Sequence, residues 1–339
     1  MRKILKYSKP SAALLSAKKA FFTDNDALLK NALKINMVYS KQPRRTKCKN
    51  CDEKIGGSEF SSHGIPYVIC KNCNHLNGGY EDTQEFVNSL YQEEGGSNYK
   101  KNYLDNYDSR VEGIYLPKVE FMHEVLTEID CGDNNSVLDI GCGGGHFVKA
   151  CEIKGIPAHG YDPSEELIEL GTTKMLTNTV SVIGMDEFDN IIETADSLVI
   201  SMIGVLEHVR HPNKALEAFT KSKARFLYLS LPLFSFSALL EHSNQSVFPR
   251  QLSGGHTHLY TKESIEFFSK KFGLETVAEW WFGTDIVDLF RHLSVRSNPD
   301  DEDEMAKYVW NYFGCAIDEL QNILDRQKLS SEVHIMFKK

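Results

Sequence analysis

The sequence predicts an α/β fold whose second half is a doubly wound, mostly parallel sheet. From Ser136 onward, short apolar segments typical of strands (SVLDI, AHGYD, VSVIG, SLVISMI and RFLYLSL) alternate with stretches of helical periodicity. Strands that alternate with helices form parallel sheets covered by helices on both faces. The glycine-rich segment VLDIGCGGGHF includes the first of these strands, and the turn after that strand is where such a sheet binds its ligand.

The composition limits the class of protein. Of the 339 residues, 41% are hydrophobic and 25% charged, as in an ordinary globular chain, and the net charge of −9 argues against a general nucleic-acid binder. The longest apolar run, FLYLSLPLFSFSALL, is interrupted by Pro232 and three serines, so it is not expected to span a membrane. The short segment SAALLSA does not make a secretory signal, and we expect a cytoplasmic protein.

Residues 1–45 are predicted to form a basic helical extension. Before Cys48, Lys and Arg far outnumber the acids Asp24 and Asp26. Thr23 or Asp24 is a suitable N-cap for a helix whose apolar face consists of Phe21, Leu28, Leu29, Ala32, Leu33 and Ile35. This face is expected to pack on the rest of the protein, with a partner or an acidic membrane surface as the alternative.

Residues 46–82 are predicted to form a zinc ribbon. Two CKNC motifs, Cys48-x2-Cys51 and Cys70-x2-Cys73, are separated by eighteen residues. Two such knuckles supply the four thiolates of a structural Zn²⁺ site, a pattern that suits a reducing compartment better than disulfides do. Because protein ligands fill all four positions, the ion would stabilise this small segment and would take no part in catalysis.

Residues 83–125 are predicted to form a tyrosine-rich helical connector or lid. Tyr99, Tyr103 and Tyr107 fall on one face of a helix at intervals of four residues. The sheet domain then occupies residues 126–339 and includes a helical insertion at about 285–329. It closes with the strand SEVHIMFKK, and the pair of tryptophans in EWWFG is expected in the core or in a pocket wall.

Two acidic residues frame the glycine-rich turn. Asp139 ends the strand before the glycines, where it would repel a pyrophosphate laid across the turn and would suit a cationic or hydroxyl-bearing ligand. Asp162 ends the next strand, in HGYDPS, where it could accept hydrogen bonds from both hydroxyls of a ribose. Glycines at the turn let the backbone approach the ligand, and the following helix offers free N–H groups.

Together these features resemble the class I S-adenosylmethionine-dependent methyltransferases, over about residues 110–339. VLDIGCGGG is similar to their first motif and GYDPS to their ribose-binding segment. The resemblance implies a Rossmann-like fold and S-adenosylmethionine as cofactor. It also assigns cofactor-binding residues: Asp139, Gly141, Cys142, Gly143 and Gly145 at the methionine and ribose, Asp162 and Pro163 at the ribose, and Met185 and Asp186 at the adenine.

The segment SMIGVLEHVRHPNKAL has the Leu-Glu-His-Val form that this family carries after its fourth strand. By that resemblance the backbone turns beside the donor methyl group. His208 is then the candidate general base, since a histidine takes up a proton near neutrality. Glu207 would orient His208 or contact the cofactor. The alternative is structural, with Glu207 capping a helix and His208 packing against its neighbours.

A second histidine cluster, GGHTHLYTKES, contains His256 and His258. It resembles the His-Leu-Tyr/Phe element that shapes the acceptor pocket in relatives, so His256 is a candidate catalytic residue. A purely structural polar contact is the alternative, and a His-x-His metal site is a third reading. Thr261, with Glu263 in the first turn, is expected to cap the following helix.

A zinc module before this fold resembles the sugar C-methyltransferases that act on nucleotide-linked keto-deoxysugars, and related methyltransferases of polysaccharide biosynthesis. The stretches CNHLNGGYED and LYQEEGGSNYKKNYLDNY are similar to their tyrosine-bearing connection, which suggests that Tyr103 reaches the acceptor site, or else packs in a lid helix. Those enzymes carry a long further domain for which this chain has no room. Methylation of a hydroxyl group is therefore expected at least as much as methylation of carbon.

The expected function is S-adenosylmethionine-dependent methylation, on oxygen or carbon, of a small molecule such as a sugar, a nucleotide sugar or another glycan precursor. One alternative is an RNA methyltransferase that binds RNA through the ribbon. The basic residues before Cys48 favour it, whereas the overall acidity and the lack of an aromatic and basic stripe do not. The other alternative is a scaffold that keeps the fold without catalysis. The sequence does not predict an oligomeric state.

Overall fold

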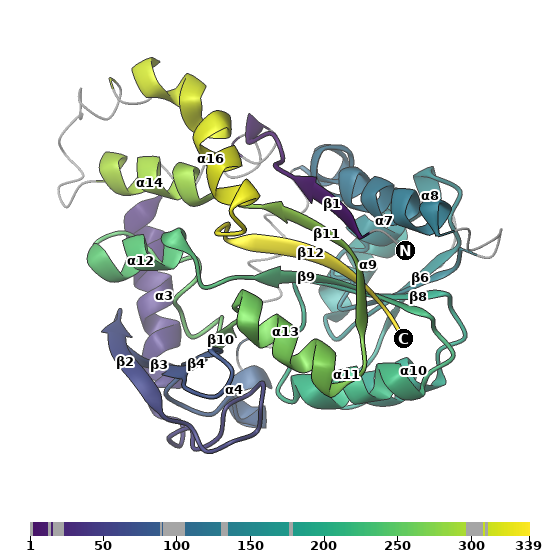
Figure 1. The fold of residues 1–339 in the computed structure, drawn as a ribbon, viewed down its shortest axis with the longest axis horizontal. Coiled ribbons are helices and arrows are strands. Elements are labelled where there is room, and N and C mark those ends of the chain that lie inside the picture. The colour runs from purple at the N-terminus through teal and green to yellow at the C-terminus, as the bar shows by residue number, and fades with distance from the viewer. Residues whose placement is uncertain are drawn as a thin grey trace.

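The computed structural model describes residues 3–12, 15, 24–88, 90, 106–129, 135–175, 179–295, 308 and 311–339. In these ranges the chain forms an eight-stranded sheet with helices on both faces and a smaller four-stranded sheet beside it (Figure 1). The larger sheet confirms the predicted mostly parallel α/β architecture. Among the helices of the described residues, none combines the length and the apolar character needed to cross a bilayer.

The large sheet has the strand order β1-β11-β12-β9-β8-β5-β6-β7. The strands from β9 to β7 run parallel, whereas β12 is antiparallel to β9 and β11 is antiparallel to β12. All five segments predicted as strands after Ser136 belong to it. The strands are β5 (Val137–Ile140), β6 (Ala158–Asp162), β7 (Val180–Val182), β8 (Val199–Ile203), β9 (Phe226–Pro232), β11 (Glu275–Phe282) and β12 (Glu332–Lys338).

The central strands are buried on both faces. Leu138 and Ile140 of β5 pack in one apolar cluster with residues of α10, α11 and α13, whose bounds follow below. Val137 packs in a second cluster with α7 (Leu116–Glu128) and α8. Alternate residues of a strand point to opposite faces, so strands covered on both sides need continuous apolar sequence. The helices of this domain are α8 (His146–Ile153), α9 (Glu165–Lys174), α10 (Phe188–Thr194), α11 (Pro212–Lys221), α12 (Phe236–Ser243), α13 (Lys262–Lys271), α14 (Asp285–Ser294) and α16 (Ile317–Arg326), with the 3₁₀ turn Gly314–Ala316 before α16.

The prediction of a wholly helical N-terminal extension is wrong at its start. Residues Ile4–Tyr7 form strand β1, which pairs in parallel with β11 at the edge of the large sheet (Figure 1). Four residues are too few to show a strand period, and the edge that they complete comes from the other end of the chain. Helix α3 (Asn25–Tyr39) covers the later part of the extension, with Asp24 at its N-cap.

The cysteine-rich segment forms the smaller sheet, whose order is β10-β4-β3-β2. Strands β2 (Gly57–Ser62), β3 (Ile65–Cys70) and β4 (Leu76–Gly78) are consecutive and antiparallel. Strand β10 (His258–Leu259) comes from the sheet domain and pairs with β4. Backbone hydrogen bonds therefore tie the ribbon to a segment that the sequence assigns to a separate domain.

The described part of the connector is helical. Tyr107 is buried, donates its hydroxyl hydrogen to the Gly144 carbonyl (2.9 Å) and packs against the His146 ring. Tyr107 thus supports the glycine-rich turn from outside. Tyr99 and Tyr103 lie outside the described residues. The helical elements are α4 (Gln84–Asn88), α6 (Tyr107–Arg110), the π-helical turn η2 (Val111–Tyr115) and α7 (Leu116–Glu128).

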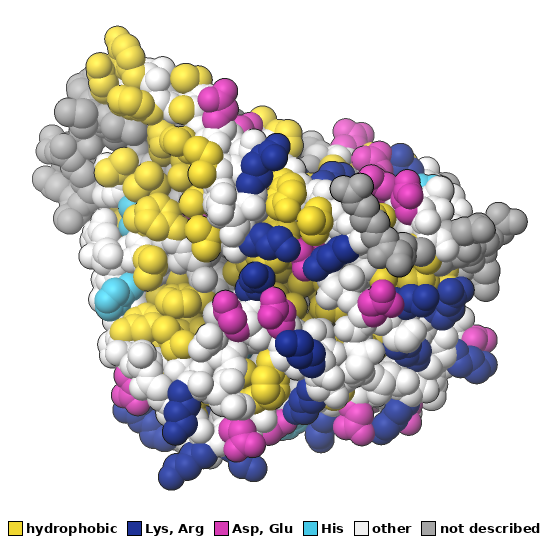
Figure 2. Space-filling model, in the orientation of Figure 1, with side chains coloured by type: hydrophobic (Ala, Val, Ile, Leu, Met, Phe, Trp, Pro, Cys, Tyr) yellow, Lys and Arg dark blue, Asp and Glu magenta, His cyan; other side chains and the backbone are white. Residues whose placement is uncertain are grey.

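The predicted helical insertion contains α14 and α16. Figure 2 shows hydrophobic side chains gathered over these two helices, at the upper left of the view. The α16 sequence alternates between a buried and an exposed side, and both sides carry apolar residues. The exposed large hydrophobic residues of this region are Leu293, Tyr308, Tyr312, Phe313, Leu320, Ile323 and Leu329.

Candidate functional site

The glycine-rich turn after β5 needs residues without side chains. Gly141 and Gly143 have φ angles of 70° and 54°, in the left-handed region that favours glycine. A Cβ atom at Gly141 would lie 2.6 Å from a methyl carbon of Val205, in the turn after β8. At Gly143 the space is open, with the nearest side-chain atom 3.9 Å away. The turn therefore packs tightly on one neighbour and leaves bare backbone facing outward.

A cavity of about 480 Å³ lies over this turn, at the carboxyl ends of β5, β6 and β8. Strands β6 and β7 lie on one side of β5 and strands β8 and β9 on the other, so the strand order reverses there. Ligands bind at such a reversal in open α/β sheets. The predicted cofactor residues that line the cavity are Gly141, Cys142, Gly143, Asp162, Pro163, Met185 and Asp186.

Asp162 fixes the glycine-rich turn to the end of β6. Its Oδ2 accepts the N–H of Gly143 (2.8 Å) and its Oδ1 accepts the N–H of Ser164 (2.9 Å). Each carboxylate oxygen has a second lone-pair site, so Asp162 can still accept hydrogen bonds from a ligand in the cavity. Burial raises the pKa of Asp162, and the two backbone N–H groups act in the opposite direction.

Asp139 occupies a different place from the one predicted. It is 2% exposed, accepts a hydrogen bond from the Ser201 hydroxyl (2.7 Å), and is not among the described residues that line the cavity. Burial, together with the nearby Asp162, raises the pKa of Asp139 to about 7. Asp139 therefore supports the turn from below, and a direct contact with the cofactor would require the turn to move.

A second cavity, of about 570 Å³, adjoins the first. The residues Tyr115, Ile203, Gly204 and His208 line both cavities, so the two meet at the turn that follows β8. The second cavity is bounded by the N-terminal segment, α3, the connector and the start of β12. It is large enough for a small molecule.

Glu207, His208 and His256 come together in the second cavity. The His208 Nδ1–H donates to the Gly255 carbonyl (2.9 Å), so in the neutral ring the basic lone pair is on Nε2. Glu207 Oε1 lies 3.9 Å from that Nε2, and the centres of the His208 and His256 rings are 5.0 Å apart. Glu207, predicted as a cofactor contact, thus lines the second cavity and not the first.

The protonation of this cluster is set by burial. Burial and the neighbouring His256 lower the pKa of His208 to about 3, so its ring is neutral at pH 7. Burial raises the pKa of Glu207 to about 8. Among the described residues, Glu207 Oε2 has no hydrogen-bond partner although it is buried. At pH 7 the His208 ring is thus a neutral but weak base, which ionisation of Glu207 would strengthen. The ligand atoms of the cluster, all within 4.8 Å of one another, are also close enough to hold a cation.

The two histidines of the HTH segment are separated. His256 lines the second cavity, whereas His258 is fully buried on β10, with its Nδ1 2.8 Å from His75 Nε2. The reading of His256 and His258 as a joint metal site is therefore wrong: the chain bends at Thr257, so that His258 pairs within β10 whereas His256 lies at the second cavity. Thr261 caps α13 as predicted: its side chain accepts the N–H of Ser264 (3.1 Å).

The four cysteines of the ribbon converge at one point. Cys48 and Cys73 have their Sγ atoms 3.7 Å apart, as do Cys51 and Cys70, and all four are buried. Thiolates about 2.3 Å from a tetrahedral zinc ion lie about 3.8 Å from one another, so this group fits such an ion. The Sγ atoms are too far apart for a disulfide. In addition, the Asn77 amide donates to Cys48 Sγ (3.4 Å).

Several cavity residues carry no sequence signal for a site. Lys9 belongs to the N-terminal segment and Lys118 to α7, and Tyr115 lies in the π-helical turn between α6 and α7. They come from parts of the chain without a recognisable motif. Tyr103, the third predicted catalytic residue, lies outside the described residues.

Solved structures to which this chain is similar include several methyltransferases. A structure of an S-adenosylmethionine-dependent methyltransferase from Archaeoglobus fulgidus is 18% identical, covering 70% of this chain and 100% of that one, with a TM-score of 0.41. Magnesium protoporphyrin IX methyltransferase from Synechocystis with bound S-adenosylhomocysteine is 15% identical, covering 60% and 94%, with a TM-score of 0.47. The plantazolicin methyltransferase BpumL, also with S-adenosylhomocysteine, is 17% identical, covering 75% and 93%, with a TM-score of 0.45. No curated protein matches the sequence.

The family assignment rests on a sequence model. The model of the methyltransferase domain family matches residues 107–279, just over half of the chain. This range includes the glycine-rich turn, the ends of β6 and β8, and the Glu207–His208 pair. The chain therefore belongs to the methyltransferase domain family and is an S-adenosylmethionine-dependent methyltransferase.

Proposed function

We propose that this enzyme transfers a methyl group to a hydroxyl group, or to a carbon atom, of a sugar or another glycan precursor bound in the second cavity. The observation that carries the proposal is the junction of the two cavities at the turn after β8, where His208 lines both. The cofactor and the acceptor would lie on either side of this turn. Holding two reactants close together in the right orientation contributes much of the rate enhancement of a transfer reaction.

The first cavity suits S-adenosylmethionine, which supplies an electrophilic methyl group on a positively charged sulfur. Bare backbone at Gly141 and Gly143 would lie against the methionine and ribose, and Asp162 would accept hydrogen bonds from the ribose hydroxyls. Met185 and Asp186 would lie at the adenine. In the second cavity, His208 Nε2 would take the proton from the acceptor, and Glu207 would stabilise the imidazolium that results.

The direct test is a transfer assay with S-adenosylmethionine labelled in its methyl group. The full chain is incubated with nucleotide sugars, free glycans and RNA, and the labelled product is isolated. Label in a sugar or glycan supports the proposal, whereas label in RNA would identify the alternative function. Binding of S-adenosylmethionine with no transfer to any member of the panel would contradict the proposed acceptor class.

The rate should rise with pH as Glu207 ionises. Below its pKa of about 8 the Glu207 carboxyl is neutral, and above that pH a carboxylate lies 3.9 Å from His208 Nε2. A negative charge at that distance makes His208 a stronger base. We expect kcat/KM of the wild type to increase through about pH 8. Glu207→Gln should remove this rise, and an unchanged pH profile in that variant would exclude the role of Glu207.

We further propose that the four ribbon cysteines hold a structural zinc ion, and that the protein works in a reducing compartment such as the cytoplasm. Cys70→Ser should lower the zinc content from about one ion per chain to nearly none and should lower the melting temperature, since ligand loss opens the site. Metal analysis by mass spectrometry measures this directly. Cys315→Ser, at an exposed cysteine, is the matched control and should keep its zinc. A full zinc content in Cys70→Ser would contradict the assignment.

A further inference from the structure

The wall of the second cavity carries more positive than negative side chains. Four cationic and two carboxyl residues line it: Lys9, Arg110, Lys118, Arg250, Glu207 and Glu332. Glu207 is mostly neutral at pH 7 because burial raises its pKa. Glu332 is thus the one lining carboxylate, among the described residues, that is fully ionised at that pH.

The turn at Ser8, which three hydrogen bonds stabilise, places Lys9 at the cavity. Strand β1 ends at Tyr7, and Ser8 takes a left-handed conformation with a φ of 65°, which costs free energy for a residue with a side chain. Three hydrogen bonds hold this turn: Ser8 N–H to the Trp281 carbonyl, Trp280 Nε1–H to the Ser8 carbonyl, and Ser8 Oγ–H to Asn322. The turn redirects the chain from the sheet edge toward the cavity that Lys9 lines.

The Lys9 ammonium has weak partners. Among the described residues its Nζ donates to the Ile114 carbonyl at 3.3 Å and lies 5.5 Å from the centre of the Phe282 ring. Burial, reinforced by the nearby Lys118 charge, lowers the pKa of Lys9 to about 7. Such a shift is expected where a cation is desolvated without a full counter-charge, and a bound anion would reverse it.

Lys118 and Lys9 share one carboxylate. Lys118 is 7% exposed, and its Nζ lies 3.7 Å from Glu332 Oε1, beyond good hydrogen-bonding distance. The same Oε1 already accepts hydrogen bonds from His334 Nε2 (2.8 Å) and the Ser230 hydroxyl (3.0 Å). One buried ammonium group, of Lys118, and one half-buried group, of Lys9, therefore lie near a carboxylate whose Oε1 already has two other donors.

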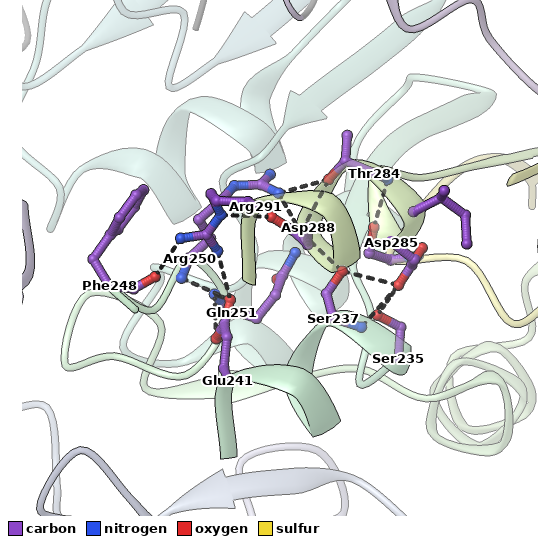
Figure 3. A network of polar contacts seen from close by, with 12 residues as sticks. Ser235, Ser237, Glu241, Phe248, Arg250, Gln251, Thr284, Asp285, Asp288 and Arg291 are labelled. Carbon is purple, nitrogen blue, oxygen red and sulfur yellow. Dashed lines mark hydrogen bonds and ion pairs between the residues drawn. The ribbon is translucent and has the colours of Figure 1, made fainter. Parts of the chain in front are cut away.

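The charge of Arg250, in contrast, is paired with a carboxylate, that of Asp288. Its Nη1 lies 2.6 Å from Asp288 Oδ2 and 2.6 Å from the Thr284 hydroxyl, within the polar network drawn in Figure 3. Asp288 also pairs with Arg291, and the Glu241 carboxyl accepts the backbone N–H of Arg250. The charge of Arg250 is paired within this network, so the excess positive charge lies on the other lining cations, which are Lys9, Lys118 and Arg110. Arg110 is hydrogen-bonded to the Tyr115 side chain, which leaves the two lysines.

We propose that Lys9 and Lys118 form an anion-binding subsite, and that the methyl acceptor carries a phosphate or carboxylate group that binds between them. This inference rests on the proposed function, in which the second cavity holds the acceptor. An anion there would complete the pairing of both ammonium groups through charge-assisted hydrogen bonds. The acceptor would then be an acidic or phosphorylated sugar and not a neutral one. The N-terminal segment, through Lys9, would contribute to substrate recognition.

The test uses inorganic phosphate and acetate as probes. Each is titrated by calorimetry, at low ionic strength, into the full chain saturated with S-adenosylhomocysteine, so that the first cavity is filled. We expect at least one of the two anions to bind. The double variant Lys9→Met and Lys118→Met, which keeps the aliphatic stems, should weaken that binding at least about tenfold. Stronger binding of phosphate would indicate a phosphorylated acceptor, and stronger binding of acetate a carboxylic acid.

Lys6→Met is the matched control, since Lys6 lies in the same segment but stacks on the Trp280 ring outside the cavity. Its anion affinity should stay within about twofold of the wild type. If the double variant does not fold, Lys9→Met alone should still weaken binding. Absence of anion binding in the wild type, or equal binding in a folded double variant, would overturn the subsite. Methyl transfer to a neutral sugar alongside that result would leave the proposed function intact.

Discussion

His208→Asn should lower kcat by about 10²- to 10⁴-fold, the range that a positioned general base contributes. Asparagine can still donate from its side chain toward the Gly255 carbonyl, as His208 Nδ1 does, but it has no nitrogen that can take up a proton. The loss should therefore be chemical and not structural. S-adenosylmethionine affinity, measured by calorimetry, should change little, since His208 lines only the edge of the first cavity.

His123→Ala, at an exposed histidine of α7 that lines neither cavity, is the control and should keep the wild-type rate. A normal kcat in His208→Asn would exclude His208 as the base. The same assay with a chelator separates two roles for the Glu207, His208 and His256 cluster. Loss of activity with chelator, restored by a divalent cation while metal analysis shows the ribbon zinc unchanged, would show that the cluster binds metal and would contradict the role of His208 as base.

Asp162→Ala should weaken S-adenosylmethionine binding by about 10- to 100-fold. A hydrogen bond to a charged group contributes about 1.5–3 kcal/mol, and each 1.4 kcal/mol is a factor of ten in affinity. The variant also loses the acceptor for the Gly143 and Ser164 N–H groups, so the glycine-rich turn should loosen. Both effects act in the same direction, and calorimetry with S-adenosylmethionine measures their sum.

A comparison of two ligands distinguishes the loss of the ribose hydrogen bonds from the loosening of the glycine-rich turn. If Asp162 holds the ribose hydroxyls, the wild type should bind adenosine more tightly than 2′-deoxyadenosine, and Asp162→Ala should bind both alike. A loosened turn alone would weaken both ligands equally and keep the preference. Glu166→Gln, at an exposed carboxylate of α9, is the control and should change neither affinity. A preference for adenosine that persists in Asp162→Ala would contradict the ribose assignment.

The two largest predicted effects are those of substitutions at His208 and Asp162, and both residues belong to motifs that the sequence shows clearly. Asp162 ends a strand, and its neighbours on the sheet are fixed by the alternation of strands and helices. His208 follows another such strand by five residues. Because parallel strands end at the same edge of a sheet, the sequence could predict that both residues lie beside the glycine-rich turn without knowing the distances between them.

The sequence could not predict three other features of the structure: strand β1, the position of Asp139, and the separation of His256 from His258. The four residues of β1 have no visible period, and their partner strand β11 is at the far end of the chain. Asp139 belongs to a family motif, yet it lies beneath the turn, where the hydroxyl of Ser201 in β8 donates a hydrogen bond to its carboxylate. His256 and His258 are two residues apart in sequence but belong to different surroundings, since β10 joins the ribbon sheet.

The sequence by itself determined the parallel sheet, the glycine-rich turn, the pairing of the two cysteine motifs and the neighbourhood of His208, because each depends on local spacing and on strand direction. Only the tertiary structure decided what surrounds the second cavity. Lys9, Lys118 and Glu332 lie far apart in the sequence, and their charges interact solely because the fold brings them to the wall of one cavity. Coulomb interactions depend on distance and burial in space, which spacing along the chain does not record.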